Sequence, residues 1–135
     1  MSRTRRSRGF AALELAILAP LVIPLIMFVV YEARMYLAQQ IVDEAAHAAA
    51  RAASEDASPS SAVADAPAVA LATLSAHGAS CTNPQITVDA SAFHPGGKVV
   101  VTVACDVSLK NLTLLPLRGS QTLRSAVQSS VEAYI

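Results

Sequence analysis

A long apolar segment dominates the pattern of hydrophobic and polar positions in this chain. From Phe10 to Tyr31 the sequence reads FAALELAILAPLVIPLIMFVVY, and Glu14 is its single charged residue. As a helix rising 1.5 Å per residue, these about 22 residues would extend about 33 Å, enough to cross a hydrocarbon core of roughly 30 Å. The pattern therefore predicts a transmembrane helix over 10–31.

Beyond this segment the apolar positions become sparser but keep a helical spacing. They recur at alternating steps of four and three, which is typical of a helix with one packing face. We expect a helical stalk over 32–53, whose alanine-rich seam packs either on a domain of the same chain or on other subunits. The seam consists of Tyr31, Met35, Ala38, Val42, Ala45, Ala49 and Ala52.

A polar stretch separates this long helix from the rest of the chain. Residues 54–61 read SEDASPSS, which is typical of a linker. Apolar residues then return at helical spacing over 62–77, and Gly78 supplies the left-handed position that commonly ends a helix. We expect a second, short helix there, at the start of a small domain over 62–135.

The last part of the chain changes to a period of two. Alternation from Gln85, a turn at Pro95-Gly96-Gly97 and a β-branched run over 98–109 predict an antiparallel hairpin. Residues 121–135 fit a helix or a strand, and their Ser, Thr and Val content favours a third strand. The predicted fold class is α+β, with a long N-terminal helix followed by a short helix and an antiparallel sheet of about three strands.

Composition and charge support a membrane-anchored chain. Of its 135 residues 53% are hydrophobic and only 15% charged, and aromatic residues make up 4%, so a domain outside the membrane would have a thin core. Basic residues unaccompanied by acids precede the apolar segment, an arrangement that fixes membrane orientation more often than it binds nucleic acid. We therefore expect a cytoplasmic N-terminus, an extracytoplasmic domain and no nucleic-acid partner. The basic residues are Arg3, Arg5, Arg6 and Arg8.

Glu14 is an unusual residue for a membrane helix. An ionised carboxylate at that depth costs a few kcal/mol unless it is paired or extends to the headgroups. It is the fifth residue from Phe10 in the string GFAALE, which follows the basic residues and leads into the apolar helix. This arrangement resembles the processing site of type IV prepilins. The resemblance implies that a prepilin peptidase removes the leader 1–9 by cutting between Gly9 and Phe10, and that Glu14 pairs with the new amine of a neighbouring subunit.

A closer resemblance extends over 8–54, to the TadE-like minor pseudopilins of tight-adherence (Flp-type) pilus systems. Leu15 departs from the pattern, because many members have an aromatic residue there. The resemblance implies a single-pass protein of the bacterial cytoplasmic membrane that enters a surface pilus. Its implied partners are the lipid bilayer, prepilin peptidase, other pilin or pseudopilin subunits and the pilus assembly platform. The matching residues are Gly9, Ala12, Glu14, Ala16, Pro20, Glu32 and Arg34.

Pro20 and Pro24 lie four residues apart inside the apolar helix, and hence on one face of it. Each removes a backbone donor and opens the preceding turn, so we expect a kink there. Membrane helices tolerate proline in general, and a bend could also let neighbouring subunits pack. The position of the prolines leaves both interpretations open.

Cys81 and Cys105 are the only cysteines in the chain. In an oxidising extracytoplasmic space two thiols of a small domain usually pair, so we predict a disulfide. The rival interpretation is a nucleophilic or metal-binding cysteine, and the spacing of the two cysteines favours the structural role.

No arrangement of residues in the sequence indicates catalysis. His47, His77 and His94 are scattered singly, and the sequence has no phosphate-binding glycine loop or nucleophile elbow, so we expect no enzyme activity, metal or cofactor. Two alternatives to a pseudopilin remain. One is an unprocessed surface binding domain on a membrane anchor. The other is a soluble protein exported by a twin-arginine signal at Arg5-Arg6, which the length of the apolar run disfavours.

Overall fold

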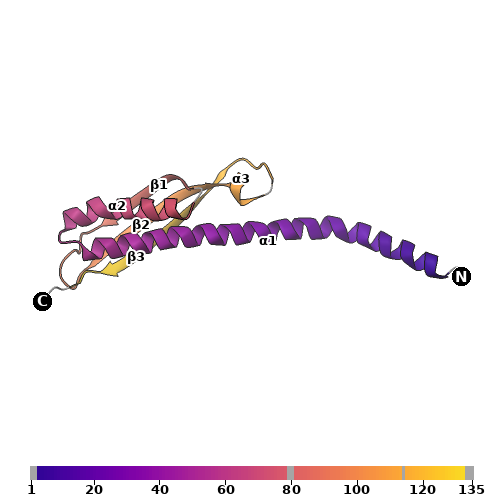
Figure 1. The fold of residues 1–135 in the computed structure, drawn as a ribbon, viewed down its shortest axis with the longest axis horizontal. Helices are drawn as coiled ribbons and strands as arrows, with labels where there is room; N and C mark the ends of the chain where they lie inside the picture. Colours follow the sequence, from indigo (N-terminus) through magenta and orange to yellow (C-terminus); the bar gives the residue numbers. More distant parts are fainter. Residues whose placement is uncertain (1–2, 79–80, 114, 133–135) are drawn as a thin grey trace.

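The computed structural model describes residues 3–78, 81–113 and 115–132, with side chains from Gly9 onward. A long helix lies beside a small sheet and continues far beyond it (Figure 1). The predicted α+β class is confirmed, including the antiparallel sheet of three strands. In chain order the elements are α1 (Arg3–Glu55), α2 (Pro59–Ala76), β1 (Cys81–Asp89), β2 (Lys98–Ser108), α3 (Leu109–Leu112) and β3 (Ser120–Ser130).

The helix α1 is one continuous element of 53 residues that passes through both of its prolines. Its N-terminal part projects away from the domain and curves gently, while its C-terminal part lies along the domain (Figure 1). All side chains from Gly9 to Ile26 are exposed, whereas fully buried positions begin at Val42. The predicted membrane segment and the predicted stalk are therefore two differently exposed parts of one helix.

A short turn at 56–58 joins α1 to α2, inside the predicted linker 54–61. Ser58 caps α2, because its Oγ accepts a hydrogen bond from the Ser61 amide at 3.2 Å and the Ser58 amide donates to Ser61 Oγ at 3.2 Å. Pro59 suits the first turn of α2, because proline has no amide hydrogen and the amides of a first turn have no acceptor within the helix. The helix therefore begins three residues earlier than the sequence pattern predicted, and Gly78 follows its end at a φ of +61°.

The sheet has the strand order β1-β2-β3, with antiparallel pairing on both sides of β2. The predicted turn between β1 and β2 is confirmed: Gly96 has a φ of +78°, and the backbone of Ala92 leaves no room for a Cβ at Gly97. The third strand is confirmed over Ser120–Ser130, whereas 133–135 lie outside the described residues.

The core lies between one face of the sheet and the two long helices. Alternate residues of β2 are buried on this face, while the intervening ones are half-exposed. The helix α1 contacts α2, β2 and β3, so the stalk seam packs on the domain of its own chain. The buried side chains are small, and the largest of those fully buried are valines. They include Val42, Ala45, Ala46, Ala49, Ala50 and Ala53 of α1, Ala62, Ala66, Ala70 and Leu74 of α2, and Val99, Val101, Val103, Cys105 and Val107 of β2.

Two details of this core differ from the sequence prediction. Ala52 was placed in the seam but is half-exposed, while Ala46, Ala50 and Ala53 are fully buried. The reason is that α1 packs against both α2 and the sheet, so a wider face is buried than a heptad seam provides. In addition, β2 ends at Ser108, and one helical turn, α3, replaces the last predicted strand residue.

Candidate functional site in the N-terminal helix

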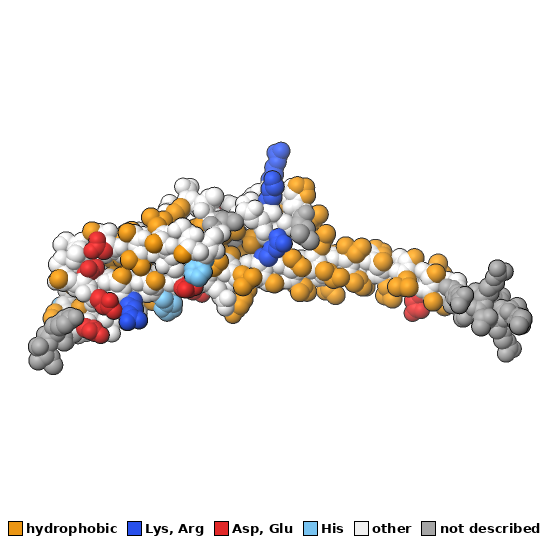
Figure 2. All heavy atoms as spheres, viewed as in Figure 1, with side chains coloured by type: hydrophobic (Ala, Val, Ile, Leu, Met, Phe, Trp, Pro, Cys, Tyr) orange, Lys and Arg blue, Asp and Glu red, His pale blue; other side chains and the backbone are white. Residues whose placement is uncertain are grey.

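The projecting part of α1 is an exposed apolar surface. Within Gly9–Glu55 an 18-residue window has a mean hydropathy of 2.6, and none of it is buried against the rest of the chain. Figure 2 shows hydrophobic side chains along this whole part of the helix. Soluble monomers rarely expose so large an apolar surface, and a helix with this length and composition can cross a bilayer.

The predicted processing residues lie at the start of this surface. Gly9 is exposed, and a Cβ there would meet no described atom within 4 Å apart from its chain neighbours and the backbone of its own helix turn. Phe10 is 75% exposed. Glu14 is also exposed and, within the described residues, forms no hydrogen bond or ion pair. Phe10 and Glu14 are four residues apart and so share one face of α1. The three residues are thus accessible to a peptidase or to a neighbouring helix.

The remaining predicted site residues of α1 are the leader arginines and the two prolines, and the structure describes the side chains of the prolines only. Arg3, Arg5, Arg6 and Arg8 belong to the helix, but their side chains lie outside the described part of the chain. The helix has no interruption at Pro20 or Pro24. A functional kink at these prolines, like the orienting role of the arginines, stays a prediction.

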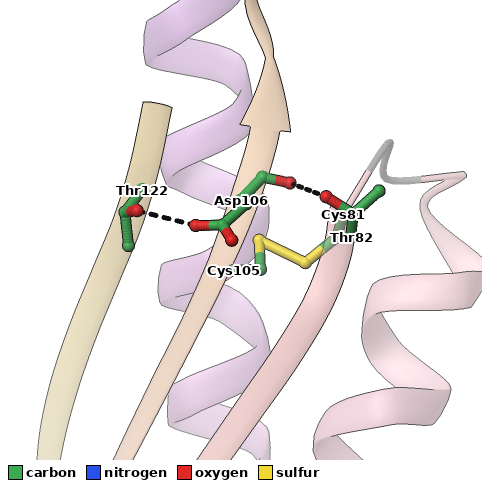
Figure 3. Close-up of a disulfide and its surroundings, with 5 residues drawn as sticks. All are labelled: Cys81, Thr82, Cys105, Asp106 and Thr122. Atoms are coloured by element: carbon green, nitrogen blue, oxygen red, sulfur yellow. Dashed lines mark hydrogen bonds between the residues drawn. A yellow bond between two sulfur atoms is a disulfide. The ribbon is translucent and has the colours of Figure 1, made fainter. Parts of the chain in front are cut away.

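Cys81 and Cys105 form a disulfide, so this prediction is confirmed and neither thiol is free. The bridge joins the first residue of β1 to the buried face of β2, with a Cα–Cα distance of 5.5 Å (Figure 3). Asp106 is held on both sides next to it, because Thr82 Oγ1 donates to its backbone oxygen at 2.9 Å and Thr122 Oγ1 donates to its Oδ1 at 2.6 Å. These bonds and the disulfide fix all three strands at the end of the sheet nearest the projecting helix.

The polar groups elsewhere in the domain are dispersed. His77 Nε2 lies 3.1 Å from Glu44 Oε2 and links α2 to α1. Burial, and secondarily the charge of Asp65, raises the pKa of Asp56, whereas hydrogen bonds from Ser91 lower the pKa of Asp89. In the part of the chain that the structure describes, no three His, Cys, Asp or Glu side chains gather closely enough to hold a metal ion.

A small hollow lies where α1 meets β2 and α3. It encloses about 190 Å³, and its lining is mostly apolar, with Leu37, Ile41, Val107 and Leu112 among the contributing residues and Arg34 the charged one. A catalytic pocket usually combines apolar walls with convergent acid or base groups, and this lining shows no such set among the described residues.

Sequence reasoning did not identify the segment that follows β2. Arg34 Nη1 of α1 donates to the backbone oxygen of Asn111 at 3.1 Å, so this segment is attached to α1 just past the apolar part. A four-residue helix has too short a pattern to reveal itself. A cluster of leucines with flanking basic residues, LKNLTLLPLR, was the available signal.

The comparisons with known proteins agree with the N-terminal resemblance. Residues 9–51 match the family model described as TadE-like protein. No curated protein and no solved structure matches the chain. The matched family is associated with pili of tight-adherence systems and is structural rather than enzymatic. The match begins at Gly9 and covers most of α1, so over this N-terminal segment the chain is similar to TadE-like proteins.

Proposed function

We propose that this chain is a minor pseudopilin, a structural subunit that prepilin peptidase cuts after Gly9 and that assembles through α1 into a tight-adherence pilus or its membrane machinery. One observation carries the proposal. The TadE-like match begins at Gly9, and the apolar surface that follows it, through Ile26, is exposed on the described chain. This surface needs lipid or other helices around it.

The proposed orientation places the N-terminus in the cytoplasm and the domain outside. The four leader arginines support it through the bias of positive charge toward the cytoplasmic side. The disulfide supports it independently, because disulfides persist in oxidising spaces and are rare in the cytoplasm. Both features support an orientation in which the sheet lies on the extracytoplasmic side of the bacterial cytoplasmic membrane.

Cleavage after Gly9 would give the apolar segment 10–31 a second charged group. The new ammonium at Phe10 and the Glu14 carboxylate of a neighbouring helix would attract one another strongly in a medium of low dielectric constant. Along a helix these residues are offset by about 6 Å, so the pair would set the register between adjacent subunits. A subunit that lacks the carboxylate would leave a buried charge without a partner.

The variant Glu14→Gln tests this role. We expect cleavage to be normal. The amount of chain that co-purifies with other pilin subunits in mild detergent should fall about tenfold, which corresponds to about 1.4 kcal/mol, because an unpaired charge in the membrane costs at least that much. Quantitative immunoblotting of the co-purified fraction measures the change. The matched control is Glu32→Gln, which removes an exposed acid from the same helix. Equal co-purification of the two variants would contradict the role of Glu14.

A further inference from the structure

We propose that the segment after β2 is a second membrane contact, which docks the domain on the anionic phospholipid headgroups of the bilayer that α1 crosses. We call the described residues 109–113 and 115–119 the basal loop. The proposal rests on the insertion of α1 proposed above. Beyond the insertion of α1, the proposal assigns a lipid-binding surface to the extracytoplasmic domain and a fixed height of that domain above the membrane.

The position of the basal loop along α1 carries the first step. Arg34 Nη1 donates to the Asn111 oxygen at 3.1 Å, and Arg34 lies three residues past Tyr31, the end of the apolar segment. Three residues advance a helix by about 4.5 Å. The headgroup zone extends roughly 5–7 Å beyond the hydrocarbon core on each side. Figure 1 shows α3 and the chain that follows it at the end of the domain nearest the projecting helix. The loop therefore lies at headgroup depth.

The chemistry of the loop fits that depth. Leu115 and Leu117 are each 46% exposed, as is Leu71 of α2 at 44%, whereas Leu112 of the same loop and Leu123 of β3 are buried. Tyr36, on α1 just beyond Arg34, is 65% exposed, and tyrosine is enriched at membrane interfaces. Exposed apolar side chains next to a bilayer can enter the boundary between headgroups and acyl chains.

The charges of the loop favour anionic lipid. Residues 109–119 include Lys110 and Arg118 and no acid, and Arg34 adds a third basic group at the same level. Glu32, two residues before Arg34, offsets one of these charges. Figure 2 shows Lys and Arg side chains at this end of the domain, whereas most of the visible acidic side chains lie toward the other end. Basic groups close to a membrane surface attract anionic headgroups.

Hydrogen bonds hold the backbone of the basal loop in a defined conformation. The exposure of Leu115 and Leu117 therefore does not come from an unfolded segment. Leu109 donates from its amide to the Gly119 oxygen at 3.0 Å, which closes the base of the loop. Thr113 Oγ1 lies within hydrogen-bond distance of the oxygens of Leu109 and Leu115, at 2.9 Å each, and the Leu117 amide donates to the Leu115 oxygen at 2.8 Å. These bonds fix the backbone of the loop, while the side chains of Leu115 and Leu117 are partly exposed.

The test measures the depth of the loop in a membrane. The full chain carrying Leu117→Cys, with its native disulfide left oxidised, is labelled with a nitroxide and reconstituted in vesicles of phosphatidylcholine and phosphatidylglycerol. Collision with oxygen and with a water-soluble nickel chelate reports depth. Val22→Cys marks the apolar helix, and Ala57→Cys, an exposed position in the turn between α1 and α2, marks the aqueous phase. We expect the label at 117 to lie between the two, with nickel collisions several-fold fewer than at 57.

A charge variant tests the lipid class. With Lys110→Gln and Arg118→Gln together, nickel collisions at 117 should rise several-fold toward the aqueous value, while Arg51→Gln, an exposed basic residue on α1 near its end, should leave them unchanged. Unaltered depth in vesicles of phosphatidylcholine alone would overturn the assignment to anionic headgroups.

The remaining outcomes separate this inference from the proposed function. A label at 117 as exposed to nickel as one at 57, with Val22 in the hydrocarbon, would overturn the loop contact and leave the membrane helix intact. An aqueous Val22 would overturn both. A label at 117 shielded from both reagents, increasingly so at more chain per lipid, would show that a neighbouring subunit covers the loop instead of lipid.

Discussion

Replacing Cys81 and Cys105 together with alanine is expected to lower the free energy of unfolding of the extracytoplasmic domain by about 3.5 kcal/mol. The two cysteines are 24 residues apart in the sequence, and in the chain-entropy model a closed loop of that size restricts the unfolded state by about this amount. The core provides little reserve, because its largest fully buried side chains are valines. The loss should therefore remove most of the stability of so small a domain.

Amide hydrogen exchange of β2, measured on the full chain in detergent micelles, reports this change. The wild-type chain treated with a reductant is the matched control, and it should lose the same protection as the double variant. Protection in β2 that falls by less than about fivefold, which corresponds to 1 kcal/mol, would show that the core is sufficient without the bridge.

The substitution Ala66→Leu is expected to destabilise the domain by about 2 kcal/mol. Ala66 is fully buried on α2 and belongs to the same core cluster as the alanines of α1. Helices that meet through alanine approach closely, so the added atoms of leucine must separate α2 from α1 or from the sheet. Overpacking of this kind typically costs 1–3 kcal/mol.

Ala68→Leu is the matched control, because Ala68 lies two residues away on the same helix and is exposed. Its effect should stay within about 0.5 kcal/mol. Thermal unfolding of both full-length variants in the same detergent gives the comparison. If Ala66→Leu matched Ala68→Leu, the contact between the helices would be loose, and the stalk seam would then be free to pack on other subunits.

The prediction from sequence was most successful where a pattern is long or chemically distinctive. The apolar run, the change to a period of two and the Pro95-Gly96-Gly97 turn each constrain the backbone strongly, and the structure confirms the elements they indicated. The disulfide was predictable because two cysteines in a small oxidised domain have few alternatives. The candidate site at Gly9, Phe10 and Glu14 came from the resemblance of this string and its leader arginines to a prepilin processing site, and its role stays a prediction.

The start of β1 was not predictable, because local signals oppose the tertiary structure there. Asn83, with a φ of +52°, and Pro84 indicate a loop, yet β1 begins at Cys81 and shifts its register around these two residues. An edge strand tolerates this, since one side of it needs no ladder donors. The disulfide at Cys81 holds the strand end against β2 despite the irregularity.

The basal loop was missed for a different reason. The sequence alone does not distinguish buried from exposed leucines over 109–117, and only the folded chain shows that Leu112 is buried while Leu115 and Leu117 are exposed. The position of these leucines along the axis of α1, just past its apolar segment, depends on the Arg34–Asn111 contact. That contact joins residues 77 positions apart in the sequence. A pattern along the chain carries no information about such a contact.

The most direct test of the account is the mass of the protein extracted from membranes of cells that contain the peptidase. Cleavage between Gly9 and Phe10 predicts a chain that starts at Phe10, so the nine leader residues should be missing from every assembled copy. Intact chains that still begin at Met1, recovered from such membranes together with other pilus subunits, would contradict the proposed function.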